Sequence, residues 1–523
     1  MCCTHQKFME VKAMKGLYRS MLSTILLLML AIQCSGSVAS YGQSPTTRGA
    51  QSIIVILAEF SDLKHKTTRE HIYDLVFVQM NSYYREASYN TTWITGDVTE
   101  RWYMLPAPFA DYGDLTWASH GTKAQQDNRK KLVGDAIQSA DQDVDFRKYI
   151  CVLIVIPVPA KRIPNFASNG WNIPTNDGVK VDRATVQLET VGADTFVHEF
   201  GHTLGLRDLY DYDIAAKVGD SSKAAIYAGR WDPMSMTQGK PEHFCAYNKA
   251  ILGWILPSQV NAIIYVGENK TVKVDPLEIA NQSTYAIKIW VGGQLCYFVE
   301  VRQQVGFDTV LPDYGVLVYL VDEEKKVGSL STLSGLLVVK DGNPDTPTLD
   351  DATLDLRVNK KAGFFDRERN LSIVVTGRLG LSYTVFVGPV SQGDTMLREI
   401  ESNIMTRMTE ANKTITQAQE LETRAMRSIT VNTGGYKILQ QASDVLRSAE
   451  KAFSVYDFTV ASDRAKEAIT LFERALSVEL EESKQRQMMV EYVLVIVAVL
   501  IGIGAFAALR KSKKNKSQEV AFL

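Results

Sequence analysis

Apolar residues in the first part of the chain follow two different periods, and their order predicts an α/β domain. Residues 51–62 (QSIIVILAEFSD) and 149–157 are continuous apolar runs, which are typical of buried strands. Residues 69–85 and 125–140 instead repeat apolar positions every three or four residues, as a helix that faces a core does. Residues 88–106, rich in aromatic and turn-forming residues, are expected to form short strands and turns.

From residue 259 the pattern changes to short alternating or apolar runs separated by Gly, Asn, Asp and Pro. Such runs are typical of all-β domains, so a β-sandwich-like domain is expected over residues 259–390. The runs that carry this prediction are TVKVDPL, YAIKIWV, CYFVEVR, GVLVYLVDE, LSIVVTG and SYTVFVG.

Residues 391–487 return to helical spacing, with apolar positions that recur at intervals of three and four. Gly434 and Gly435 are expected to interrupt the pattern, and two further helices are expected at about 436–454 and 459–486. These segments together predict an α-helical stalk or bundle.

Two long apolar segments lie near the ends of the chain. A basic flank precedes residues 21–32 and small residues follow them, which predicts a secretory signal peptide over residues 1–39. Residues 492–509 carry no charge over 18 positions, so a transmembrane helix is expected at 488–509. The basic residues of the tail, 510–523, place that end in the cytoplasm by the positive-inside rule. The protein is therefore expected to be a single-pass protein of the cell membrane with its N-terminal ectodomain outside.

Composition changes this picture little. A chain of 523 residues is long enough for two to four domains, and its net charge of −2 gives no basic stripe for a nucleic-acid partner. Cys151, Cys245 and Cys296 remain after the predicted signal peptide, which allows at most one internal disulfide.

The chemistry of the chain is concentrated in the segment HEFGHTLGLRDLYD, residues 198–211. His198 and His202 are four residues apart, a spacing that places both imidazoles on one face of a helix, where they can share a metal ion. Glu199 is then placed to deprotonate a metal-activated water, and Gly205 can end the helix. Asp208, after that turn, is the expected third ligand.

A plain structural interpretation of the same residues also exists. Two histidines at helical spacing can be a satisfied polar pair in a core, and a glycine followed by an aspartate can be an ordinary helix end. Against this, the helix is expected to open at Asp194-Thr195, which are good N-cap residues, and to be amphipathic. Met234, in the following segment WDPMS, is either a methionine turn beneath the metal or core filler.

These segments, in this order, resemble the immune inhibitor A family of secreted zinc metallopeptidases over about residues 50–325. The family pattern also has an aspartate at the position of Asp208, whereas Arg207 stands where a proline is usual. The resemblance implies an α/β zincin-like metallopeptidase domain at residues 40–258, with His198, His202 and Asp208 as zinc ligands and Glu199 as general base. The further segments that carry the resemblance are EFSD, SYNTTWITGDVTERWYMLP, YNKAILGWI and YFVEVRQQVGFDTVLPDYGVLVYLVDE.

Several roles stay open at the level of sequence. Asp232 and Glu242 are the other candidates for third ligand, and the group that stabilises the oxyanion is not identified. The side chains near enough in sequence for that role are Tyr210, Tyr227, His243 and Tyr247. The acidic loop at residues 345–355 is a candidate calcium site, with an ordinary solvated loop as the alternative.

The function expected from this set is zinc-dependent hydrolysis of a protein or peptide substrate outside the cell. One alternative is a non-catalytic adhesion or scaffold protein that keeps zinc for stability, although Glu199 would have no use there. The other alternative is a zinc hydrolase of a non-peptide amide, because the motif defines the activation of water and not the substrate. The oligomeric state is left undetermined.

Overall fold

The computed structural model describes residues 47–116, 119, 121–159, 162–218, 221–236, 239–326, 335–358 and 360–519. The predicted signal peptide, residues 1–39, lies outside the described residues. The described chain divides into two compact units, which meet along the sequence at Asp394 and Thr395. A short piece around residues 357–359 also groups with the second unit.

The first unit begins with a five-stranded mixed sheet in the order β2-β1-β3-β7-β4. Four of its strands are parallel, and the edge strand β4 runs antiparallel to β7. In sheet order the strands are Thr92–Met104, Gly49–Glu59, Cys151–Ile156, Ala184–Leu188 and Phe166–Ser168. The central strands form where the sequence is continuously apolar, because both faces of the sheet are covered.

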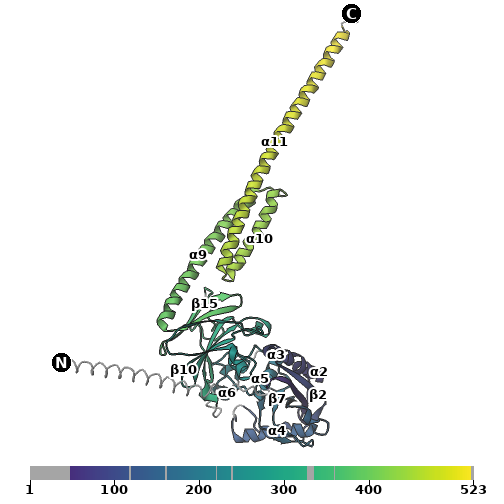
Figure 1. The fold of residues 1–523 in the computed structure, drawn as a ribbon. Helices are drawn as coiled ribbons and strands as arrows, with labels where there is room; N and C mark the ends of the chain where they lie inside the picture. Colours follow the sequence, from purple (N-terminus) through teal and green to yellow (C-terminus); the bar gives the residue numbers. More distant parts are fainter. Residues whose placement is uncertain are drawn as a thin grey trace, which may run out of the picture. The chain divides into compact units, whose positions relative to one another are not determined.

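Helices cover the two faces of this sheet (Figure 1). Alternate residues of β1 point to opposite sides, so Ile53 joins a core with Phe196 of helix α5, Ala193–Thr203. Ile54 joins a second core with Leu132 of helix α4, Lys123–Ala140. The predicted helix at 69–85 is one continuous helical segment made of α2 (Arg69–Tyr73), the π-helical η2 (Asp74–Met80) and α3 (Asn81–Ala87).

The segment 88–106 differs from its prediction. It forms one 13-residue strand, β2, that pairs in parallel with β1, so the expectation of short strands and turns was wrong. The pairing shifts register between Val55 and Leu57, and β2 lies at the edge of the sheet with several exposed positions. Edge position explains its mixed polar and aromatic sequence, because an edge strand keeps several side chains in contact with solvent.

Two further sheets follow in the same compact unit, and all six apolar runs predicted from residue 259 onward contain strands. One sheet has the order β13-β12-β11-β10-β8 and the other β14-β15-β16-β9, with antiparallel pairs except for β10 and β8. The strands β8 to β16 are Val260–Ile264, Lys270–Val274, Ala286–Gly292, Leu295–Arg302, Gly315–Asp322, Leu337–Val339, Gly363–Asp366, Leu371–Leu379 and Ser382–Gly388.

The predicted boundary at residues 258/259 does not separate two compact units. Phe298 and Tyr319 of the second sheet belong to the same apolar core as Phe196 and Phe244. Cys151, Cys245 and Cys296 are buried and free, so burial of apolar surface holds this unit together rather than disulfides among these three cysteines. The remaining short elements of the first unit are β5 (Ile173–Pro174), β6 (Lys180–Val181), α6 (Tyr212–Val218), α7 (Ala246–Ile251) and several single helical turns.

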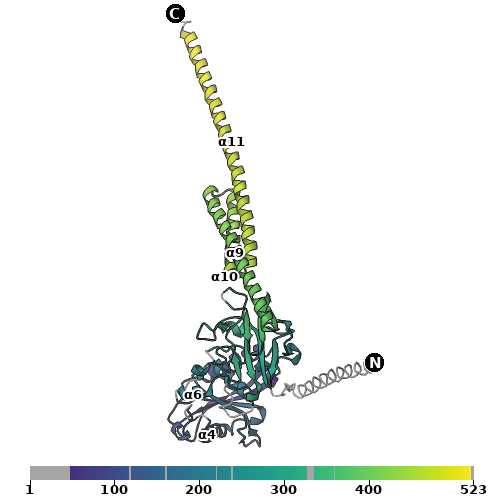
Figure 2. The ribbon, with the colours of Figure 1, turned by 90° about the vertical axis from the view of Figure 1, so that its left-hand side faces the viewer.

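The second unit is helical, as the sequence predicts. Helices α9 (Val390–Ser428), α10 (Gly434–Ser454) and α11 (Phe458–Glu519) lie alongside one another (Figure 2). Their contact surface is rich in buried alanine, which lets helix backbones approach closely. Gly434 and Gly435 begin α10 instead of interrupting a helix, because Thr433 caps it by accepting a hydrogen bond from the Tyr436 amide.

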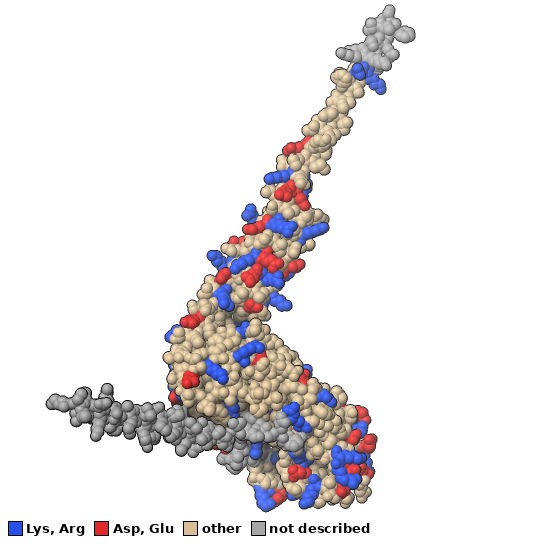
Figure 3. All heavy atoms as spheres, in the orientation of Figure 1, with Lys and Arg blue, Asp and Glu red and all other residues tan. Residues whose placement is uncertain are grey.

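Helix α11 continues without a break through the predicted transmembrane segment. Its C-terminal part is long and apolar enough to cross a membrane, and none of that stretch is buried against other parts of the protein. Figure 3 shows this stretch free of charged side chains, between a highly charged part of the helix and a small basic group near its end. Arg510 and Lys511 follow the apolar stretch in the sequence.

Candidate metal centre

The metal motif lies on α5, and the end of this helix is as predicted while its start is not. The N-cap residue is Gly192, and Asp194 lies inside the first turn, where its carboxylate accepts a hydrogen bond from the Gly239 amide at 2.7 Å. Asp194 therefore ties a later loop to the helix, and its negative charge is favourable near the positive, N-terminal end of the helix dipole. At the other end Gly205 has φ +102°, the left-handed conformation that turns the chain back towards Asp208.

Both histidines are oriented by backbone carbonyl groups. His198 Nδ1 lies 2.7 Å from the Pro233 carbonyl oxygen, and His202 Nδ1 lies 3.0 Å from the Leu206 carbonyl oxygen. A carbonyl oxygen can only accept, so each Nδ1 carries a proton and donates it. Each Nε2 then has a free lone pair in the neutral imidazole, which is the form that binds a metal.

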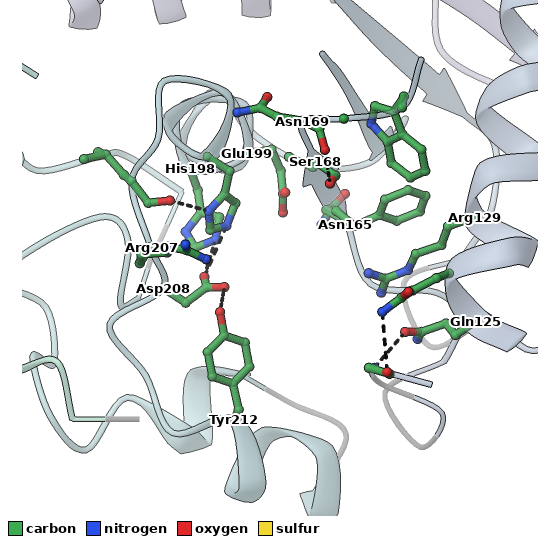
Figure 4. A pocket seen from close by; sticks show the side chains of 18 of the residues that line it. Gln125, Arg129, Asn165, Ser168, Asn169, His198, Glu199, Arg207, Asp208 and Tyr212 are labelled. Carbon is green, nitrogen blue, oxygen red and sulfur yellow. Dashed lines mark hydrogen bonds and ion pairs between the residues drawn. The ribbon is translucent and has the colours of Figure 1, made fainter. Parts of the chain in front are cut away.

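The two Nε2 atoms face one carboxylate oxygen. Asp208 Oδ1 lies 3.0 Å from His198 Nε2 and 3.3 Å from His202 Nε2, as Figure 4 shows. The other oxygen, Oδ2, accepts a hydrogen bond of 2.6 Å from the Tyr212 hydroxyl, which fixes the carboxylate. Three potential ligand atoms, one from each residue, thus lie within 4.8 Å of one another.

This arrangement strongly attracts positive charge. Burial lowers the pKa of His198, but the hydrogen bond and charge of Asp208 outweigh it and raise the pKa to about 9. Burial raises the pKa of Asp208, yet His202 and His198 hold it well below its ordinary value. Three lone-pair donors that converge in a buried place repel one another unless protons or a cation lie between them. Two imidazole nitrogens and one carboxylate oxygen are a donor set that suits Zn²⁺.

The two other candidate ligands lie elsewhere. Asp232 is buried and its oxygens accept hydrogen bonds from the amides of Met234 and Cys245 and from the side chain of Asn248. Glu242 is buried too, and neither residue belongs to the group of converging ligand atoms found among the described residues. The structure thus brings Asp208, and not these two carboxylates, to the histidines.

Glu199 lines the same pocket as the two histidines. It is only 5% exposed, and its Oε2 atom has no hydrogen-bond partner. Burial raises the pKa of this carboxyl above its ordinary value, although the two histidines act against the rise. A buried carboxylate with an unused oxygen and a raised pKa is suited to take up a proton from a molecule in the pocket.

The segment WDPMS forms a turn that packs against the metal motif and supports it. The Met234 carbonyl oxygen accepts a hydrogen bond of 2.8 Å from the Leu209 amide, next to Asp208, while the preceding carbonyl of Pro233 orients His198. The Met234 side chain is fully buried. It packs against α5, because a Cβ atom placed on Gly201 would lie 2.8 Å from its sulfur. The turn therefore positions both parts of the metal motif.

Arg302 on β11 connects this turn to the second sheet. Its guanidinium, which is fully buried, donates hydrogen bonds to the carbonyl oxygens of Trp231 and His243 at 2.7 and 3.1 Å. It also forms ion pairs with Glu278, Glu300 and Asp308. Sequence reasoning did not find this residue, because a basic residue on a predicted strand gives no sign of burial.

The pocket beside the metal motif has a volume of about 750 Å³. It is bounded by the first half of α4, by the edge strand β4 with the residues around it, by α5, and by the loop from Gly205 to Tyr212. Sequence reasoning missed six other polar residues of the pocket, which lie outside the metal motif and share no spacing that could reveal them. These residues are Gln125, Arg129, Asn165, Ser168, Asn169 and Tyr212.

The four candidates for stabilising an oxyanion have different surroundings. Tyr210 lines the pocket, with its ring stacked at 6.4 Å from that of His198. The Tyr227 hydroxyl donates to Asp211, and His243 is buried between Glu86 and Lys249. Tyr247 is buried against Phe298. Tyr210 is thus the one of the four that lines this pocket.

The acidic loop has protein partners for several of its carboxylates. Asp345 pairs with Lys361 and Asp350 with Arg230, while Asp351 accepts hydrogen bonds from neighbouring side chains. A calcium site there stays a prediction from the sequence.

No protein-family model matches this chain, and no curated protein matches its sequence.

Proposed function

We propose that this protein is a membrane-anchored zinc endopeptidase of the immune inhibitor A type, which hydrolyses peptide bonds outside the cell. The observation that carries the proposal is the convergence of His198 Nε2, His202 Nε2 and an oxygen of Asp208 beside the unpartnered Oε2 atom of Glu199. A site that served stability alone would be closed by a fourth protein ligand and would not need a base.

In this proposal each residue has a distinct task. His198, His202 and Asp208 would hold the zinc ion, which would supply a Lewis acid for the attacking water and the scissile carbonyl. Glu199 takes the proton from the attacking water and delivers it to the leaving amine. Tyr212 and the carbonyl groups of Pro233 and Leu206 keep the three ligands in place.

The edge of the sheet offers a place for an extended peptide. Strand β4 is the edge strand next to the metal motif, and residues Asn165 to Trp171 line the pocket. An extended chain can add to such an edge through backbone hydrogen bonds, with limited demands on side chains. This geometry favours a polypeptide over a small amide as the substrate.

The test is hydrolysis of a reduced, alkylated protein by the zinc-loaded full-length chain in detergent, beside its Glu199→Gln variant. We expect cleavage by the parent and a loss of at least about 100-fold in the variant, with zinc content unchanged. A folded, zinc-loaded parent that cleaves no protein would move the assignment to a scaffold protein or to hydrolysis of a non-peptide amide. Cleavage that survives in Glu199→Gln would remove the role given to Glu199.

A further inference from the structure

Arg129 is a partly buried cation in the pocket without an anionic partner. It lies on α4, and its guanidinium stacks on the Phe166 ring at 4.5 Å from the ring centre. Its Nε atom is buried without a hydrogen-bond partner, and Arg129 forms no ion pair with any residue that the structure describes. Lys130 and Arg207 also line the pocket, but both are exposed to solvent.

A partly buried cation without an ion pair is unfavourable, so its presence at a pocket wall suggests a counter-charge from outside the chain. Burial lowers the pKa of Arg129 to about 10, so the guanidinium stays protonated at neutral pH. The negative charge of Glu199 favours the protonated form of Arg129 and raises its pKa, yet no hydrogen bond joins the two side chains. Glu199 thus stays available as a base, and the donors of Arg129 stay available for a ligand.

The position of Arg129 relative to the reacting groups is fixed by three elements. Figure 4 shows its side chain reaching from α4 into the space that Glu199 enters from α5. Phe166, which carries the stacked guanidinium, belongs to the edge strand β4. A peptide that added to the edge of β4 would therefore lie in the pocket that Arg129 and Glu199 both line. The planar guanidinium presents paired N–H groups that match the two oxygens of a carboxylate.

We propose that Arg129 forms a carboxylate-binding subsite, so that the enzyme selects peptides with an acidic group near the scissile bond. The carboxylate belongs either to a glutamate or aspartate side chain or to the C-terminus of the peptide, since both present the same chemistry. This inference rests on the proposed peptidase function for its kinetic test, and the experiment includes a binding measurement that does not.

The kinetic test uses zinc-loaded full-length protein in detergent and a set of fluorogenic peptides. One glutamate is moved through the positions of a neutral peptide, and each member is paired with its glutamine counterpart. All peptides are made with an amidated C-terminus and again with a free one, which separates side-chain from terminal recognition. We expect one position, or the free terminus, to raise kcat/KM by about tenfold or more over its neutral counterpart.

Three variants connect that preference to Arg129. Arg129→Gln should bring the acidic-to-neutral ratio close to one, and Arg129→Lys should keep part of it because charge remains without the paired donors. Lys131→Gln, which removes an exposed charge on the same helix outside the pocket lining, is the matched control and should change the ratio by less than about twofold. Peptides cleaved by the parent with no acidic preference would overturn the proposal. An equal loss on acidic and neutral peptides in Arg129→Gln would also overturn it, because Arg129 would then act on the reacting carbonyl.

Binding separates a failure of this inference from a failure of the proposed function. Fluorescence anisotropy of the same labelled peptides is measured with Glu199→Gln protein, with and without Arg129→Gln. Tighter binding of acidic peptides that Arg129→Gln abolishes, together with no cleavage by the parent, would keep the subsite and refute the peptidase. Equal binding of acidic and neutral peptides would refute the subsite, whatever the parent cleaves.

Discussion

Gly201 offers a sharp test of how the turn at Met234 supports the metal helix. A Cβ atom at this position would lie 2.8 Å from Met234 Sδ, 3.5 Å from Phe244 Cζ and 3.6 Å from Leu206 Cδ1. The first of these contacts is shorter than van der Waals separation, so Gly201→Ala must displace the Met234 side chain. The turn carries the carbonyl that orients His198, so the displacement should reach the metal site.

Two opposing terms set the size of the effect on stability. Alanine in a helix interior is favoured over glycine by about 1 kcal/mol. Overpacking a filled core costs about 1–3 kcal/mol, and Met234 is fully buried with little room to move. The expected net result is a loss of about 1 kcal/mol of stability. Zinc affinity should fall about tenfold, the lower end of the effect seen when the support of a ligand is disturbed.

A double-mutant cycle with Met234→Ala isolates the contact. Met234→Ala alone should cost about 2–5 kcal/mol through the cavity it leaves. In the double variant the new methyl group occupies part of that cavity without a clash, so the total cost should be less than the sum by about 1 kcal/mol or more. The free energies come from urea unfolding of the full-length protein in detergent, followed by tryptophan fluorescence, with zinc affinity from competition with a chelator. Additive costs, within about 0.5 kcal/mol, would refute this packing argument.

The remaining predictions concern the ligands and the buried arginine. Asp208→Asn should weaken zinc binding by at least about 100-fold in a chelator competition, since it removes the charged ligand, and unchanged affinity would exclude Asp208 as a ligand. Tyr212→Phe should weaken it by about tenfold through the lost hydrogen bond to Asp208, with normal stability in urea as the control. Arg302→Met should cost about 3–5 kcal/mol in urea unfolding, because three carboxylates and two carbonyl groups lose their shared partner; a cost below about 1 kcal/mol would contradict this. Burial raises the pKa of Asp308, but Arg302 lowers it to about 2, so its stabilising effect is complete above pH 3.8 and is lost as the pH falls towards 2. The stability difference between the parent and Asp308→Asn should therefore shrink below pH 4, and a difference that stays constant down to pH 2 would contradict the pairing with Arg302.

The parts of the site that sequence could predict are those encoded by local spacing. His198, Glu199 and His202 share one helix, and Asp208 follows after a glycine turn, so eleven consecutive positions were enough to place four groups. The start of the same helix was misplaced by two residues, because Asp194 uses its carboxylate on the Gly239 loop and not on the helix end. A tertiary contact decided the role of a residue that local preference assigned to a cap.

The parts that sequence could not predict depend on contacts between distant segments. Arg129 and Ser168 reach the pocket from a helix face and an edge strand, and neither position carries a periodic signal that distinguishes it from an exposed surface. Arg302 stands in a strand of the second sheet and supports a turn 71 residues away. The strands from residue 259 onward follow a local pattern, so the sequence predicted them. The core shared by residues on both sides of residue 258 depends on contacts between distant segments, so the sequence did not predict it.

The central claim is that His198, His202 and Asp208 hold one zinc ion. X-ray absorption spectroscopy of the zinc-loaded full-length protein, read with the zinc stoichiometry of the parent and of Asp208→Ala, tests it most directly. We expect one zinc per chain with two imidazole ligands, oxygen in the remaining positions and no sulfur, and a loss of bound zinc in the variant. Sulfur ligation, a zinc shell without imidazole, or full zinc retention in Asp208→Ala would contradict it.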